Sequence, residues 1–134
     1  MSSQVINRSN PSGSSRCEPQ LFYHIREEDK LLNVHGVSSP MLIKFSVSND
    51  WVHVGEFILP TGGINPRASE PDTHAGDAVL YVERGPVTFF LPDTTDAFKV
   101  EAGEAMFVPE GTRYQMINYT AGAIKVVFAI APEL

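Results

Sequence analysis

The stretch Gly103-Glu104-Ala105-Met106-Phe107-Val108-Pro109-Glu110-Gly111-Thr112-Arg113-Tyr114 decides the fold. The run Ala105 to Val108 has the length and apolar character of a short strand, and Pro109-Glu110-Gly111 ends it with turn residues. A second strand-like run, Tyr114 to Asn118, follows at once. Two short strands joined by a proline–glycine turn are typical of antiparallel β-structure.

The same punctuation continues on both sides of this stretch. Strand-like runs cover residues 41–48, 51–59, 78–82, 87–91, 105–108, 114–118 and 124–130, and the ten glycines and ten prolines of the chain concentrate between such runs. Only Arg26 to Leu32 is expected to form one or two helical turns. Many short strands with turn residues between them predict an all-β sandwich or barrel.

Composition limits the class of protein. The 134 residues suffice for one domain, and 43% hydrophobic with 19% charged residues is typical of a soluble globular chain. The net charge of −6 argues against nucleic acid and anionic membranes as partners. A lone cysteine, Cys17, excludes an intrachain disulfide and multi-cysteine metal sites. No apolar stretch resembles a membrane span or a secretion signal, so we expect a cytoplasmic protein.

The first 19 residues differ from the rest of the chain. They are rich in serine and nearly free of large apolar side chains, so ordering them would bury too little surface to offset the entropy lost. We therefore predict a flexible tail over residues 1–19 and a single β domain over residues 20–134. A recruitment arm or a swapped segment is the alternative for the tail.

Two glycine-punctuated blocks resemble the sequence motifs of the cupin superfamily. The first runs from Asp72 to Gly85, and the second is the opening stretch extended to Asn118. The second block matches the family motif at Gly103, Pro109, Gly111 and Asn118, with the family spacing. The resemblance extends from about Ser39 to the C-terminus and implies a single jelly-roll β-barrel, all-β, with a ligand site in the barrel mouth.

The chain departs from the family pattern at the metal ligands. Asp72 stands at the first histidine position, His74 keeps the second, Ala78 replaces the glutamate and Tyr114 replaces the histidine of the second motif. Only one of the four usual ligands is kept in kind. The resemblance therefore implies either a divalent transition metal on His74, Asp72 and Tyr114, or a metal site that has decayed.

The same positions form a candidate catalytic group. On a strand, Glu70, Asp72 and His74 would point to one face, and Tyr114 would bring a phenol from the opposite sheet. Carboxylate, imidazole and phenol can act as general acids and bases without a metal, so His74, Tyr114 and Asp72 are the candidate catalytic residues. The alternatives are a turn in which Asp72 caps the chain while His74 faces solvent, and a Tyr114 that only fills the barrel.

Four further residues are candidates for ligand binding: Asp77, Arg67, His53 and Glu70. Asp77 follows the flexible Ala75-Gly76 pair and would bring a second carboxylate to the mouth. The planar guanidinium of Arg67 suits a carboxylate or phosphate. His53 precedes the Gly62-Gly63 break, although a surface or structural histidine is the alternative reading.

Three functions follow from these residues. The first is an enzyme that binds a small polar molecule, sugar-like or carboxylate-bearing, and carries out isomerase-, epimerase- or lyase-type proton transfer. The alternative is a non-catalytic ligand-binding or regulatory cupin, and the third is a metal-dependent dioxygenase. Exposed sheet edges and the apolar segment Leu21 to Ile25 predict a homodimer in each case.

Overall fold

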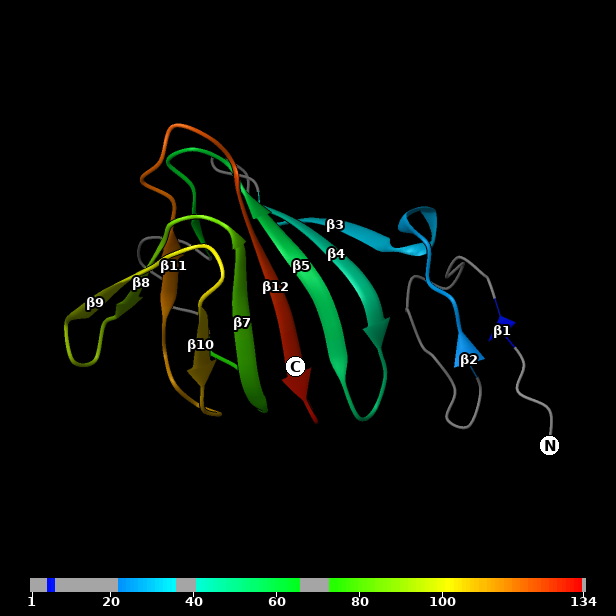
Figure 1. Ribbon diagram of the computed structural model, residues 1–134. Coiled ribbons are helices and arrows are strands. Elements are labelled where there is room, and N and C mark those ends of the chain that lie inside the picture. The colour runs from blue at the N-terminus through cyan, green and yellow to red at the C-terminus, as the bar shows by residue number, and fades with distance from the viewer. Residues whose placement is uncertain (1–4, 7–21, 36–40, 66–72, 134) are drawn as a thin grey trace.

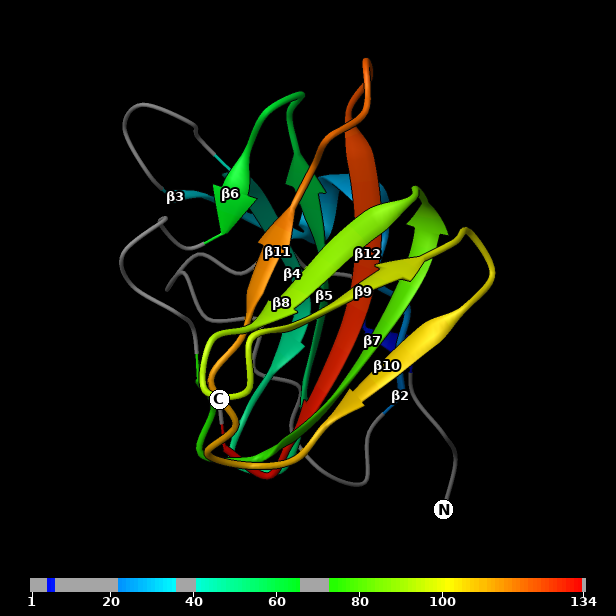
Figure 2. The same ribbon diagram turned by 90° about the vertical axis from the view of Figure 1, so that its left-hand side faces the viewer.

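The protein is built from two antiparallel sheets that face each other. The computed structural model describes residues 5–6, 22–35, 41–65 and 73–133. The larger sheet has six strands in the order β10-β7-β12-β5-β4-β3, and the smaller has four in the order β6-β11-β8-β9. Figures 1 and 2 show the two sheets as the layers of one barrel. The predicted all-β jelly roll is confirmed.

The strand bounds follow the apolar runs of the sequence closely. The strands are β1 (Val5–Ile6), β2 (Phe22–Tyr23), β3 (Leu31–His35), β4 (Met41–Ser48), β5 (His53–Leu59), β6 (Ile64–Asn65), β7 (Asp77–Arg84), β8 (Val87–Leu91), β9 (Asp96–Val100), β10 (Ala105–Val108), β11 (Gln115–Ile117) and β12 (Ile124–Ala131). The predicted runs 41–48, 87–91 and 105–108 agree with β4, β8 and β10 to the residue.

Two local details differ from the prediction. The segment Arg26 to Leu32 forms one 3₁₀ turn, η1 (Glu27–Asp29), and its last two residues belong to β3, because they pair with β4. Strand β9 was not predicted, since its exposed residues show no alternation; it is held by pairing with β8. Among the described residues, no helix is long and apolar enough to cross a membrane.

The predicted tail lies almost wholly outside the described residues. Within residues 1–19 the structure describes only Val5–Ile6, which pair in parallel with Phe22–Tyr23. These two residues are therefore in a strand and not in a free tail. For the other residues of the segment, Cys17 among them, the flexible tail stays a prediction.

The barrel core fills the space between the sheets. Along β7 and β12, buried and more exposed residues alternate, so one side of each strand faces inward. Phe57 and Phe128 stack in the interior with ring centroids 4.5 Å apart. Fully buried aliphatic side chains such as Leu80 and Val126 complete the packing. Truncating one such leucine to alanine typically costs about 2–5 kcal/mol, so this core supplies much of the stability.

Asn118, the last residue of the second motif, has a structural role. Its side-chain amide donates to the carbonyl oxygens of Leu59 (3.0 Å) and Gly122 (2.8 Å), and its side-chain oxygen accepts from the backbone N–H of Thr120 (2.8 Å). The residue is fully buried. It therefore closes the turn before β12 and ties that turn to the end of β5.

One end of the barrel collects the segments that carry the candidate site. Strands β4, β10 and β12 end there and β5 and β7 begin there, at the bottom of Figure 1. His74 lies in the irregular segment directly before β7. We call this end of the barrel the His74 end.

Candidate functional site

A short hydrogen bond joins the imidazole of His74 to the phenol of Tyr114. The Nε2 to Oη distance is 2.6 Å, and the two rings lie 5.6 Å apart at an interplanar angle of 47°. Tyr114 is fully buried and stacks against Phe89, with ring centroids 6.3 Å apart. His74 is half-buried. The pair thus has one member fixed in the core and one at the surface of the barrel.

The backbone around His74 is held by the turn between β10 and β11. The Gly111 N–H donates to the His74 carbonyl oxygen at 2.9 Å, and the Glu110 N–H donates to Asp77 Oδ1 at 2.9 Å. Gly111 has a φ of +76°, a conformation that favours glycine. The family-motif glycine therefore permits the turn that positions His74.

Gly76 brings the same segment against the C-terminal strand. A Cβ at this position would lie 2.5 Å from the Ala131 carbonyl oxygen, so no side chain fits there. The close approach holds the chain just after His74 against the end of β12. The Gly111 contact thus holds the His74 backbone, and the Gly76 contact holds the chain two residues later.

Asp77 lies apart from the His74–Tyr114 pair. It is the first residue of β7, where it is exposed, and it alternates with the buried Ala78. Because successive side chains of a strand point to opposite faces, its carboxylate is on the outer side of the barrel. There it accepts from the Glu110 amide and anchors the turn, a contact that the sequence did not reveal.

His53 lies at the same end of the barrel with a different partner. Its Nδ1 is 2.7 Å from Ser48 Oγ, across the hairpin that joins β4 to β5. The register places His53 opposite Ile130, which is itself opposite Ala78, so these three residues form one inward-facing row. Ser48 was not among the predicted site residues; the register of the β4–β5 hairpin places it opposite His53.

Three predicted site residues, Asp72, Arg67 and Glu70, lie outside the described residues. The expectation that Glu70, Asp72 and His74 alternate along one strand was wrong for His74. That residue is in an irregular segment, because β7 begins only at Asp77. The pairing of His74 with Tyr114 therefore depends on the turn contacts described above and not on strand alternation.

The described residues do not fit a transition-metal centre. Ala78, at the position of the family glutamate, presents only a buried methyl group. Tyr114 Oη lies at hydrogen-bond distance from His74 Nε2, so the two groups of the motif bind each other. No group of three or more histidine, cysteine or acidic side chains that could hold a metal occurs within the described part of the chain. One imidazole and one phenol are too few donors for such an ion.

A cluster of charged side chains lies elsewhere, on the outer face of the larger sheet. Glu56 Oε2 is 2.8 Å from Lys125 Nζ, and Glu56 Oε1 is 3.3 Å from Lys30 Nζ. Burial raises the pKa of Glu56, but the hydrogen bonds from Lys125 and Lys30 outweigh it, so the pKa lies below its ordinary value. Glu56 alternates with the inward-facing Phe57, so this cluster stabilises the sheet and is separate from the His74 end.

Comparison with known proteins identifies the architecture. No protein-family model and no curated protein sequence matches the chain. Among solved structures, the polyketide cyclase RemF from Streptomyces resistomycificus is similar with a TM-score of 0.65 and 19% identity, over 82% of this chain and 79% of that one. A cupin domain from Bordetella pertussis is similar with a TM-score of 0.59 and 22% identity, over 72% and 98%. KdgF from Halomonas sp. is similar with a TM-score of 0.61 and 16% identity, over 75% and 87%.

Proposed function

Because the chain has the cupin fold, we propose that it binds a small polar molecule at the His74 end of the barrel and moves a proton on that molecule. The substrate class is sugar-like or carboxylate-bearing, and the reaction is of the isomerase, epimerase or lyase type. The observation that carries this proposal is the 2.6 Å contact between a half-buried imidazole and a fully buried phenol.

The proton chemistry follows from the two ring nitrogens of His74. If Nε2 carries the proton, it donates to Tyr114 Oη, and Nδ1, as the unprotonated ring nitrogen, is the proposed base. If Oη donates to Nε2 instead, Nδ1 carries a proton that it can give. His74 is then the catalytic residue. The buried Tyr114 is a positioning residue, which fixes the ring and its tautomer.

The polar surroundings of the pair support a polar substrate. The His53–Ser48 pair lies at the same end of the barrel and adds a second imidazole and a hydroxyl. Arg67, Asp72 and Glu70 remain proposed contacts for a carboxylate or for sugar hydroxyls. Hydroxyl-rich and anionic molecules need several such donors and acceptors, because a buried polar group without a partner costs binding free energy.

A non-catalytic ligand-binding protein is the second candidate. The observation that favours it is the replacement of two family ligands by Ala78 and Tyr114, both of which are fully buried. In that case the His74 end would bind a ligand without turnover. The third candidate, a metal-dependent dioxygenase, has no supporting observation among the described residues.

Binding is the first requirement of both candidates and is tested by ligand-observed NMR with a panel of uronic acids, aldonic acids and neutral sugars. We expect at least one compound to bind the wild type and to bind His74→Ala at least tenfold more weakly. His24→Ala is the matched control, because His24 is exposed and outside the site. Equal binding to both variants would contradict a ligand site at His74.

A further inference from the structure

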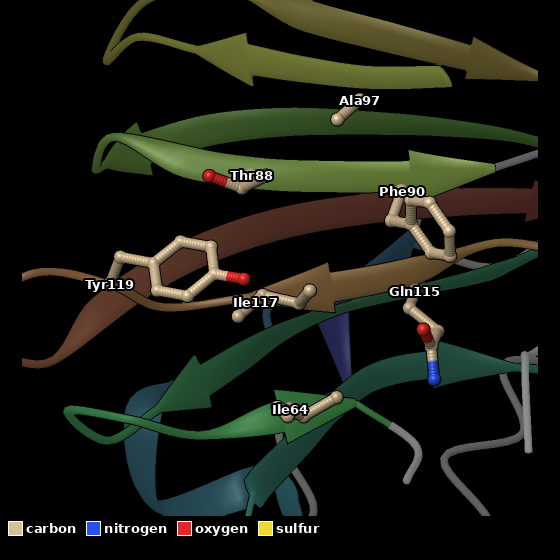
Figure 3. Close-up of a pocket in the computed structure, with 7 residues that line it drawn as sticks. All are labelled: Ile64, Thr88, Phe90, Ala97, Gln115, Ile117 and Tyr119. Carbon is tan, nitrogen blue, oxygen red and sulfur yellow. The ribbon is translucent and has the colours of Figure 1, made fainter. Parts of the chain in front are cut away.

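A pocket lies on the outer face of the smaller sheet. Its volume is about 280 Å³. Figure 3 shows the side chains that line it. They come from all four strands of this sheet, except Tyr119, which follows β11: Ile64, Thr88, Phe90, Ala97, Gln115, Ile117 and Tyr119.

The strand register separates this pocket from the barrel interior. Ile117 lies opposite both Ile64 and Thr88, and Phe90 lies opposite Ala97 and Gln115, so these side chains share one face of the sheet. The residues that alternate with them, Phe89 and Met116, are fully buried in the core. The whole thickness of the smaller sheet therefore lies between this pocket and the core that packs around Tyr114.

The lining is apolar, with a few polar groups and no charge. Ile64, Phe90, Ala97, Ile117 and the ring of Tyr119 form its walls. The hydroxyls of Thr88 and Tyr119 make no hydrogen bond to any other residue that the structure describes. In Figure 3 the Tyr119 ring extends over the pocket, with its hydroxyl pointing toward Ile117.

We propose that this pocket binds a neutral small molecule consisting of a flat, mainly apolar ring system with one hydroxyl or carbonyl group. The volume lies just below the range of about 300–1,000 Å³ for sites of drug-sized ligands, which fits one or two rings. The lining residues carry no charge, and Lys99, which lies opposite Thr88, is 3.6 Å from Glu101 Oε1. A charged ligand would therefore lose its hydration without finding an opposite charge in the pocket. This proposal is independent of the function proposed for the His74 end.

The exposed aromatic ring of Tyr119 indicates what the ligand covers. Tyr119 is 75% exposed, and Phe90 is partly exposed beside it, although both rings are large and apolar. A flat ring placed against them would remove apolar surface from water and form favourable aromatic contacts. The hydroxyls of Thr88 and Tyr119 would then bind the single polar group of the ligand and orient it.

The test uses 2-naphthol, which is neutral at pH 7, and follows the backbone amides of the ¹⁵N-labelled protein by NMR. We expect saturable shifts at Thr88, Ala97 and Ile117. Ala97→Trp should fill the pocket and weaken binding at least tenfold, whereas Phe98→Trp should change it less than twofold. Phe98 is the matched control, because it is on the same strand, is 43% exposed and points to the opposite face.

A second variant and a charged probe complete the test. Thr88→Val keeps the shape of the side chain and should weaken 2-naphthol binding by about fivefold, the value of one hydrogen bond. Naphthalene-2-sulfonate, with the same rings and a negative charge, should bind at least tenfold more weakly than 2-naphthol. Absence of saturable shifts, equal binding to Ala97→Trp, or shifts confined to His74 and Tyr114 would overturn the proposal.

Discussion

His74 Nε2 lies 2.6 Å from Tyr114 Oη, although the two residues are 40 positions apart in the chain. This contact brings together the first and second glycine-punctuated motifs. The turn at Gly111 and the close approach at Gly76 hold the imidazole, while the core around Phe89 holds the phenol. The site is therefore built from backbone geometry on one side and core packing on the other.

Removing the phenol oxygen should loosen the imidazole at a small cost in stability. Tyr114→Phe keeps the stacking on Phe89 but deletes the hydrogen bond to His74, so we expect unfolding to become easier by about 1 kcal/mol. Imidazole ¹⁵N shifts should show one ring tautomer in the wild type and a mixture in the variant. An unchanged tautomer in the variant would contradict the positioning role of Tyr114.

Adding one methyl group at Gly76 should disturb the site through the backbone. In Gly76→Ala the new Cβ meets the Ala131 carbonyl at 2.5 Å, so we expect a loss of about 1–3 kcal/mol in the free energy of unfolding. Gly122→Ala is the matched control, because nothing lies within 4 Å of a Cβ there, and it should change stability by less than about 0.5 kcal/mol. Equal effects in urea denaturation would show that the close approach is unimportant.

The ion pairs of Glu56 should make the free energy of unfolding depend on pH. Its pKa in the folded state lies below the ordinary value of 4.5, so the stabilisation is complete above that pH and is lost as the pH falls through the folded-state pKa. Glu56→Gln should lower the free energy of unfolding at pH 7 by about 1–2 kcal/mol, since Lys30 and Lys125 are partly exposed and keep Glu27 and Glu83 as partners.

The difference between wild type and Glu56→Gln should shrink when urea denaturation is repeated at pH 3. Glu83→Gln is a suitable control, because Glu83 is 45% exposed and lies 3.5 Å from Lys125. Its effect should stay below about 0.5 kcal/mol at either pH. A pH-independent difference for Glu56→Gln would contradict a charged Glu56 in the cluster.

The homodimer remains a prediction, and the outer face of the larger sheet supplies a place to test it. Phe107 is 61% exposed, and Val79 and Tyr81 on the neighbouring strand are 45% and 44% exposed. Apolar side chains gathered in this way are typical of protein interfaces. Phe107→Glu should convert a dimer into a monomer in sedimentation at micromolar concentration, whereas Phe98→Glu on another strand should leave the mass unchanged. A monomeric wild type would contradict the prediction.

The sequence predicted the strands that alternate and missed those that depend on pairing. Strand β4 was predicted to the residue because apolar and polar side chains alternate along it. Strand β9 was missed because four of its five residues are exposed, and Leu31–Leu32 were included in a helical turn although they begin β3. In both cases pairing with the neighbouring strand, β8 for β9 and β4 for β3, holds the segment in the sheet.

In the candidate site, too, some features could be predicted from the sequence and others depend on the folded sheet. The motif spacing indicated His74 and Tyr114, and the structure places them in contact. The motif spacing could not show that Asp77 turns outward to the Glu110 amide. A shift of one position along a strand moves a side chain to the opposite face, and the spacing does not fix where β7 begins. It also could not reveal the outer pocket, whose walls come from strands that are neighbours only in the folded sheet.

Deuterium exchange into a bound substrate is the most direct measurement of proton transfer by His74. The protein is incubated in D₂O with the uronic, aldonic and neutral sugars that bind it, and deuterium incorporation at carbon is followed by NMR. We predict incorporation by the wild type, a loss of about 10²–10⁴-fold in His74→Ala and no change in His24→Ala. Exchange that persists at the wild-type rate in His74→Ala, or bound ligand without exchange in the wild type, would contradict proton transfer by His74.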